Sequence, residues 1–263
     1  MKPISFIIPS RNNKTYLEMC YNSIRKNSGY THEICFADDF SEDGTWEYLQ
    51  EIKSKDDNVK IYRNEGPERL GLTILYDKIV EEMATNDRLL FFHSDMYLFP
   101  DALDYVDEYL KEGVVVTLTR VEPPLHPEGP EKIVVDFGIE PDELKEQQLL
   151  DWYRRYEPTQ EITEGVFAPW SIMRKDFESI GGHDKLFRPQ SKEDSDIFNR
   201  LHLSGVKFIQ TWKGLVYHMT SRGSRFNPYS GGAPGKDSPE WLYTTNKNMR
   251  EFIRKWGTMV QHD

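Results

Sequence analysis

The 263-residue sequence predicts an α/β fold built on a mainly parallel sheet with helices on both faces. Short apolar runs alternate with helical patterns over the first 120 residues. With 44 acidic against 33 basic residues, the net charge of −11 argues against nucleic-acid binding. No apolar stretch reaches the ~18 residues of a transmembrane segment, and Pro9 ends the first run too early for a signal peptide. We therefore expect a cytoplasmic protein.

The beginning of the chain predicts a β-α-β-α-β unit. Residues 4–8, 34–37 and 59–62 are short apolar runs, which is the pattern of strands buried on both faces of a sheet. Residues 16–24 and 46–52 between them place apolar side chains at helical spacing. Because helical crossovers join parallel strands, the three strands should pair in parallel.

The same alternation continues to residue 118. Residues 72–83 predict a helix and residues 88–92 a buried strand. Another helix should begin at Pro100, and residues 114–118 predict a further strand. Sheets of this kind bind ligands beyond the carboxyl ends of their strands, so polar residues at those positions are candidates for a site.

The second half of the chain is less regular. Residues 121–164 contain six prolines and many acids, which predicts an excursion from the sheet whose role is open. After residue 165 we expect two helices and two strands, at 176–180, 191–203, 206–210 and 214–217. Residues 219–239 predict a mobile loop, and residues 240–255 predict a final amphipathic helix.

Acidic residues follow two of the predicted strands. Side chains alternate along a strand, so we expect Asp39 rather than Asp38 to face a ligand, while capping of the next helix explains Asp38 equally well. Asp95 ends a strongly apolar strand, where a carboxylate must be solvated, paired or bound to a metal. Capping of the following helix is the alternative, although Asp101 lies nearer the start of that helix.

Two further candidates lie in the second half. Asp194 follows a glycine turn and is a candidate general base, with a capping box from Ser191 to Asp194 as the alternative. His218 ends a strand and precedes Arg222 and Arg225, which predicts a corner that binds a metal and a phosphate. No Gly-x-x-x-x-Gly-Lys-Ser/Thr or Gly-x-Gly-x-x-Gly motif occurs, which argues against P-loop enzymes and ordinary dinucleotide enzymes.

Together these motifs resemble glycosyltransferase family 2 from Ile4 to about Arg225. The resemblance rests on the opening strand with its nucleotide loop, the Asp-Asp-x-Ser-x-Asp-Gly-Thr segment, the Asp-x-Asp position, and the Gly-Gly-Phe-Asp and Glu-Asp segments. These correspond here to Ser5–Asn12, Phe36–Thr45, Phe92–Asp95, Ile180–Asp184 and Glu193–Asp196.

The resemblance implies an inverting nucleotide-sugar glycosyltransferase of GT-A type, with a Rossmann-like sheet and a C-terminal acceptor-side region. It divides one continuous domain into a nucleotide-sugar-binding half (1–120), an insertion (121–164) and an acceptor and catalytic half (165–263). It also implies a UDP-sugar as the favoured donor, a saccharide or glycoconjugate acceptor, and Mn²⁺ or Mg²⁺ as cofactor. The acceptor is either soluble or a membrane glycolipid reached peripherally.

The resemblance also implies roles for individual residues. Asp194 would be the catalytic base, and Asp95 and His218 would bind the metal. The residues expected on the donor side are Pro9, Arg11, Asp39, Arg69, Ser94, Arg222 and Arg225. On the acceptor side we expect Glu193 and Trp170, whose ring either stacks on a sugar or belongs to the core.

One departure from the family pattern affects the metal. His93 stands where the family has the first acid of Asp-x-Asp, so the metal would be held by Asp95 with at most one imidazole, that of His218. The histidine favours Mn²⁺ over Mg²⁺. The departure also keeps open a non-catalytic nucleotide-sugar-binding module of the same fold. A nucleotidyltransferase is the other alternative, although the expected glycine- and lysine-rich loop is missing.

Overall fold

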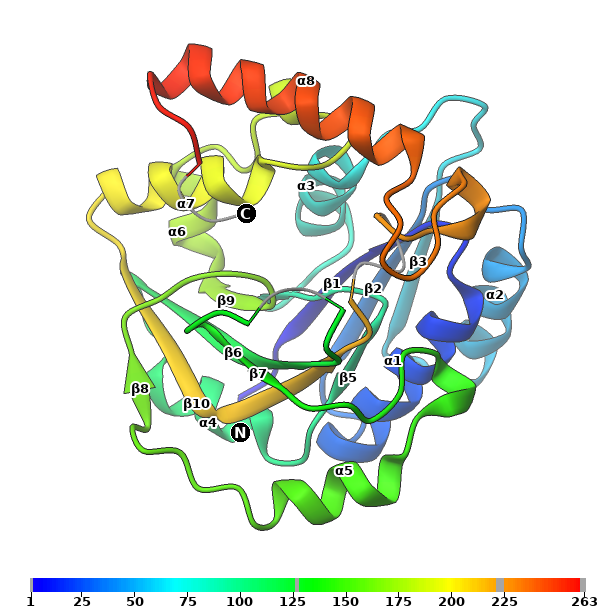
Figure 1. Cartoon of the computed structure of the whole chain (residues 1–263), viewed down its shortest axis with the longest axis vertical. Helices are drawn as coiled ribbons and strands as arrows, with labels where there is room; N and C mark the ends of the chain where they lie inside the picture. Colours follow the sequence, from blue (N-terminus) through cyan, green and yellow to red (C-terminus); the bar gives the residue numbers. More distant parts are fainter. Residues whose placement is uncertain (1, 126–127, 221–224, 261–263) are drawn as a thin grey trace.

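The computed structural model describes residues 2–125, 128–220 and 225–260. Within these residues, ten strands form one sheet in the order β3-β2-β1-β4-β9-β6-β10-β5, with β7 and β8 paired beside this path (Figure 1). The strands are β1 (Ser5–Ser10), β2 (Glu33–Asp38), β3 (Val59–Arg63), β4 (Arg88–Phe91), β5 (Met96–Leu98), β6 (Val114–Glu122), β7 (Lys132–Val134), β8 (Ile162–Thr163), β9 (Trp170–Met173) and β10 (Lys207–His218). The α-helices are α1 (Lys14–Ser28), α2 (Thr45–Lys55), α3 (Leu72–Glu82), α4 (Ala102–Tyr109), α5 (Glu146–Tyr153), α6 (Arg174–Ser179), α7 (Glu193–Leu203) and α8 (Pro239–Trp256). Short 3-10 helices are η1 (Pro141–Glu143), η2 (Lys185–Phe187) and η3 (Pro228–Ser230).

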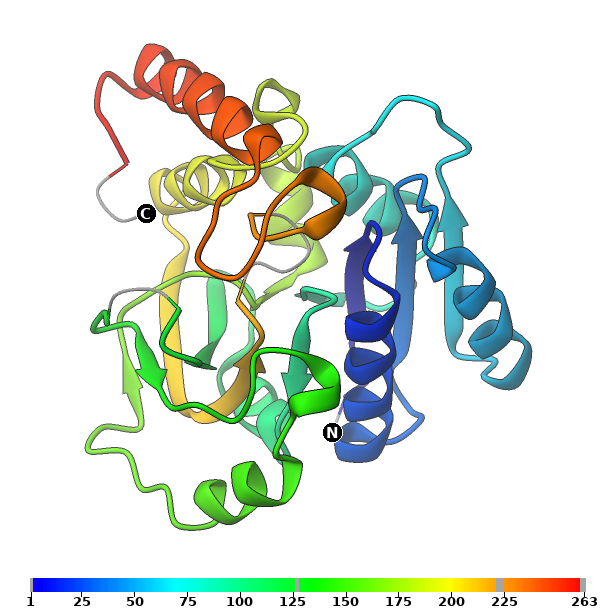
Figure 2. The same ribbon diagram turned by 45° about the vertical axis from the view of Figure 1, so that its right-hand side comes forward.

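Helices cover both faces of the sheet, as predicted (Figure 2). Along β1, Phe6 and Ile8 pack with α1, α2 and α4, whereas Ile7 packs with α3, α6 and α7 on the other face. The run in β1 is continuously apolar because alternate side chains enter two different cores. Strands β1 to β4 pair in parallel, which confirms the predicted β-α-β-α-β unit.

The pairing in the second half differs from the prediction. β9 runs antiparallel between β4 and β6, and the short strand β5 runs antiparallel to β10. The two strands expected at 206–210 and 214–217 form one strand, β10, whose register on β6 shifts between Thr211 and Leu215. This mixed pairing brings the end of β10 next to the residues that follow β4.

The segment 121–164 joins the sheet, so the expected excursion is wrong in part. β7 pairs in parallel with β6, and β8 pairs antiparallel with β10. Phe137 and Leu149 are 5% and 0% exposed and share a core cluster with Tyr217 of β10. The Tyr217 hydroxyl accepts a hydrogen bond from the Phe137 amide (3.0 Å) and donates one to the Gly138 carbonyl (2.7 Å). The described residues of this segment, 121–125 and 128–164, therefore include strands and side chains that pack as part of the domain.

The final helix, α8, lies across one end of the molecule (Figures 1 and 2). It begins with a Ser238 cap, whose side chain accepts a hydrogen bond from the Trp241 amide, and it has 18 residues. Among the described residues, no helix combines the length and the apolar character needed to cross a membrane.

Candidate functional site

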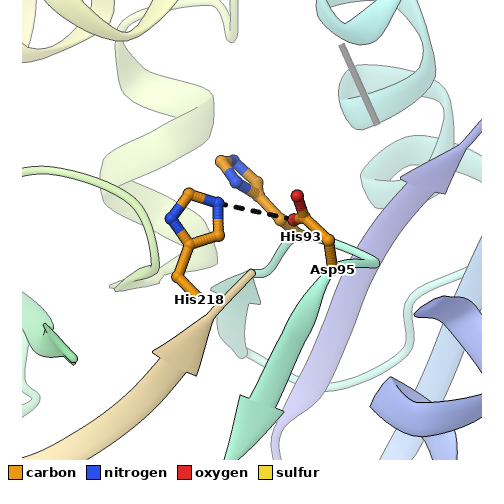
Figure 3. A group of neighbouring side chains, drawn as sticks. All are labelled: His93, Asp95 and His218. Atoms are coloured by element: carbon orange, nitrogen blue, oxygen red, sulfur yellow. Dashed lines mark ion pairs between the residues drawn. The ribbon is translucent and has the colours of Figure 1, made fainter. Parts of the chain in front are cut away.

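Three potential metal ligands meet where β4, β5 and β10 come together (Figure 3). His93 follows β4, Asp95 precedes β5, and His218 ends β10 opposite Met96 of β5. Their ligand atoms all lie within 4.8 Å of one another, and the distance from Asp95 Oδ1 to His218 Nε2 is 3.5 Å. The structure thus brings together the two residues expected to bind a metal and adds His93 to them.

His218 is oriented by a glutamate that the sequence analysis missed. Glu122, at the end of β6, lies 2.7 Å from His218 Nδ1 through its Oε1 and accepts a hydrogen bond from Lys132 Nζ (2.9 Å) through its Oε2. Arg120 Nε lies 3.5 Å from the same carboxylate. An acid at the end of a strand, as at Asp95, is the sequence signal that could have identified Glu122 as a site residue. The predicted insertion 121–164 includes Glu122 and so hides this signal.

The surroundings of the two histidines favour opposite protonation states. Burial would lower the pKa of His218, but Asp95 and Glu122 together raise that pKa to about 9. The pKa of His93 is lowered, chiefly by burial. His93 is therefore mostly neutral at pH 7, which is the form of imidazole that binds metals.

The donor set fits a divalent transition metal that displaces the Nε2 proton of His218 on binding. A carboxylate and two imidazoles are grouped within one ion's reach, and an imidazole whose Nδ1 is held by a carboxylate presents its Nε2 in a fixed direction. Two imidazoles, rather than the expected maximum of one, therefore lie within reach of a single ion. Two nitrogen donors suit Mn²⁺ and other transition metals better than Mg²⁺.

The predicted base lies at the start of α7. Asp194 is half-buried, whereas Glu193 is only 6% exposed. Burial, reinforced by the charge of Asp194, raises the pKa of Glu193, so Glu193 tends to keep its proton. The expected capping box is wrong, because Ser191 and Lys192 have φ values of 78° and 72° and the Ser191 hydroxyl bonds to Thr245 (2.9 Å) instead.

Tyr76 of α3 links the two groups of acids. Its ring is 3% exposed, and burial raises the pKa of its hydroxyl well above the usual value. The charges of Asp194, Glu193 and Asp95 raise that pKa further, and Asp194 also raises the pKa of His93. Carboxylates about 100 residues apart in sequence therefore act on the same small region. These surroundings of Tyr76 could not be predicted from the sequence, because Tyr76 lies on the apolar face of a predicted helix.

Asp39 holds the loop before α3. It is 2% exposed, its Oδ1 accepts hydrogen bonds from Asn64 Nδ2 (2.8 Å) and the Leu70 amide (2.9 Å), and its Oδ2 accepts one from the Gly71 amide (3.0 Å). Its neighbour Asp38 is fully buried, which raises the pKa of Asp38. Asp39 thus has a structural function, and its contact with a ligand stays a prediction.

Two arginines, Arg11 and Arg69, form a pair beside Asp39. Arg69 contacts Glu240 at the start of α8, and Arg11 Nη1 lies 3.8 Å from the same Glu240 oxygen. Arg69 Nε is 3.6 Å from Asp39. Burial and the nearby charge of Arg69 lower the pKa of Arg11. A single carboxylate of α8 therefore lies between two cations on the expected donor side.

The other residues expected on the donor side have varied surroundings. Pro9 is buried in β1, and the Ser94 hydroxyl accepts a hydrogen bond from Asn13 Nδ2 (2.6 Å). Arg225 forms an ion pair with Asp237. Arg222 lies outside the described residues.

Trp170 belongs to the core, which was one of its two predicted placements, and its assignment to the acceptor side is wrong. The side chain is 1% exposed. Its ring stacks on Phe91 with 4.2 Å between centroids and meets the edge of Phe198 at 5.4 Å. Antiparallel pairing of β9 with β4 directs the indole into the sheet core, leaving no face for a ligand.

Comparison with known proteins identifies the family. The model of glycosyl transferase family 2 matches residues 5–178, about two thirds of the chain. The chain belongs to this family. One family relative, the abequosyltransferase RfbV of Salmonella typhimurium, is 35% identical over 113 residues, which are 41% of this chain and 32% of RfbV.

Solved structures show the same fold. A structure of GalNAc-T7 with UDP, GalNAc and Mn²⁺ matches with a TM-score of 0.61 and 15% identity, over 97% of this chain and 57% of that chain. A structure of S. aureus TarS residues 1–349 with UDP-GlcNAc matches with a TM-score of 0.60 and 15% identity, over 99% and 74%. The chain thus spans about a third of RfbV and little over half of the GalNAc-T7 chain. The predicted GT-A architecture is confirmed.

Proposed function

We propose that this family 2 protein is a metal-dependent, inverting glycosyltransferase that moves a sugar from a nucleotide-diphosphate donor to an acceptor hydroxyl. The observation that carries the proposal is the group formed by His93, Asp95 and His218 on a family 2 fold, with ligand atoms that all lie within 4.8 Å of one another. Asp194, at the start of α7, is the candidate base that accompanies this group. The neighbours whose structures contain UDP or UDP-GlcNAc support UDP as the nucleotide of the donor.

His93, Asp95 and His218 would hold the divalent cation. When bound, a divalent cation neutralises the negative charge that develops on a diphosphate leaving group. Mn²⁺ is favoured because two imidazoles contribute and because the GalNAc-T7 structure contains Mn²⁺. Arg11 and Arg69 add positive charge on the donor side, where arginine forms strong charge-assisted hydrogen bonds with phosphate oxygens.

Asp194 would act as the general base. A base must accept the proton of the acceptor hydroxyl as that oxygen attacks the anomeric carbon from the face opposite the leaving group, which inverts the configuration. Glu193 is less suited, because its raised pKa keeps it protonated. In this scheme residues 1–120 bind the donor and residues 165–263 supply the base, while His218 brings a metal ligand from the second half.

Calorimetry with UDP, GDP, CDP and dTDP, each with and without Mn²⁺, tests the proposal. We expect one diphosphate, most favourably UDP, to bind only when Mn²⁺ is present. In an Asp95→Asn variant, Mn²⁺ should no longer increase the affinity for that diphosphate. A screen of nucleotide sugars, read as nucleotide release, would then identify the donor. Binding without turnover of any donor and acceptor would favour the non-catalytic module, and absence of nucleotide binding would refute the proposal.

A further inference from the structure

The outward surface of α8 combines basic and apolar side chains in one patch. We call this patch the α8 outer face, and its members are Leu242, Tyr243, Lys247, Arg250, Ile253 and Arg254. All six are exposed, with 45%, 74% and 39% exposure for the leucine, the tyrosine and the isoleucine. Tyr243, Lys247, Arg250 and Arg254 follow one another at intervals of three or four residues, and Leu242 and Ile253 lie beside them on the same side of the helix. The helix lies at the edge of the molecule (Figure 1).

The opposite side of α8 is firmly attached, so the outer face has a fixed orientation. Thr244, Asn248 and Phe252 are buried. Asn248 Nδ2 donates hydrogen bonds to the carbonyls of Phe187 (2.7 Å), Gln190 (2.8 Å) and Ser191 (3.0 Å). Rotating the helix to hide its apolar residues would break this contact. The outer face is therefore a permanent surface feature.

The charge of this face is opposite to that of the whole protein. Its three cations lie on a chain with a net charge of −11, and the acid beside them, Glu251, pairs with Arg254 at 2.5 Å. Exposed pairs of this kind contribute little to folding. Basic side chains next to exposed leucine, tyrosine and isoleucine match an anionic bilayer, where cations meet lipid phosphates and apolar groups enter the headgroup layer.

Two other binding partners match the α8 outer face less well, namely a second copy of this chain and a nucleic acid. A second copy packed through the same face would set its cations against identical cations, because a twofold contact brings the same patch together. A nucleic-acid backbone offers phosphates to the cations but no apolar layer for the exposed leucine, tyrosine and isoleucine.

We propose that the α8 outer face binds anionic membrane surfaces. The binding itself does not depend on the proposed transferase activity. The consequence of this binding for function does rest on the proposed transferase activity. Asn248 of α8 holds the loop that leads into Glu193 and Asp194. A docked enzyme would therefore have its acceptor side close to the bilayer. This favours the membrane-associated acceptor over the soluble one, the two alternatives that the sequence left open.

Co-sedimentation of the full chain with vesicles tests the proposal. We expect binding to an equimolar mixture of phosphatidylcholine and phosphatidylglycerol, weak binding to phosphatidylcholine alone, and release by salt. Arg250→Gln should lower the partition coefficient about fivefold, and Tyr243→Ser should also lower it. Lys55→Gln is the matched control, because Lys55, like Arg250, is an exposed helical cation but lies on a different helix, α2.

Three results would overturn the proposal. They are equal binding to both kinds of vesicle, equal loss from Lys55→Gln and Arg250→Gln, and a lipid-free dimer, seen by light scattering, that Tyr243→Ser dissociates. Circular dichroism and thermal unfolding should show that the variants remain folded. Transfer to a soluble acceptor is measured separately, so vesicle binding by an inactive protein would sustain this proposal while contradicting the proposed function.

Discussion

Replacing Glu122 should lower both the stability of the fold and the affinity of the candidate metal site. Glu122 is 3% exposed, and its carboxylate lies against His218 (2.7 Å) and Lys132 (2.9 Å). In Glu122→Ala, a buried lysine loses its partner, which costs about 3–5 kcal/mol of the free energy of unfolding. His218 loses the group that orients its ring, and loss of such a partner typically lowers metal affinity about 10–100-fold.

The affinity for Mn²⁺ can be followed by electron paramagnetic resonance of the free ion, with thermal unfolding measured on the same samples. Glu122→Gln keeps an oxygen that can accept a hydrogen bond from Nδ1 and should retain more affinity than Glu122→Ala. Glu33→Ala is the matched control, because Glu33 is also a buried strand glutamate paired with a lysine, Lys60 at 2.8 Å, but does not contact the histidines. It should lose stability and keep its Mn²⁺ affinity.

Equal Mn²⁺ affinity in the wild type and in Glu122→Ala would refute this reasoning. A similar loss in Glu33→Ala would also refute it, because the effect would then come from general destabilisation. Either result would mean that the ring of His218 is held by the surrounding packing alone.

Four further outcomes are expected. Asp194→Asn should abolish sugar transfer while leaving UDP affinity unchanged by calorimetry; retained turnover would exclude Asp194 as the base. Trp170→Ala should lower the free energy of unfolding by about 3–5 kcal/mol in denaturant titrations, without a selective rise in acceptor KM. Glu240→Gln removes the carboxylate between the paired arginines and should raise UDP affinity up to about fivefold; unchanged affinity would place the diphosphate elsewhere. Burial opposes ionisation of Glu33, but hydrogen bonds from Lys60, Ser5 and Thr85 lower its pKa from 4.5 to about 2. Its contribution, on the order of 2 kcal/mol, is therefore complete above pH 4.5 and lost as the pH falls towards 2, a loss that should be absent in acid titrations of Glu33→Gln.

The first half of the fold was predictable because its signals are local. Alternate residues of β1 enter two cores, and this places a recognisable apolar run in the sequence. Asp95 and His218 could be singled out because each ends an apolar strand. Residue type and position along one strand were sufficient for these predictions.

The remaining features depend on contacts between distant residues. Glu122 and His218 are 96 residues apart in the sequence, and the residues around Glu122 do not indicate that the two side chains are in contact. Trp170 was open to two interpretations until the antiparallel pairing of β9 with β4 placed it against Phe91. His93 looked like a lost ligand because the family pattern has an acid there, whereas its distance from Asp95 and His218 makes it a possible third donor.

The position of β9 has a consequence for how this chain emerges from the ribosome. Its neighbours β4 and β6 are synthesised more than 45 residues earlier, and both present unpaired edges until residues 170–173 arrive. Unpaired strand edges on a nascent chain can form hydrogen bonds with non-native strands. We therefore expect chains that stop before residue 170 to be targets of chaperones and proteases, and the gap between β4 and β6 to be filled only after residue 173 has been synthesised.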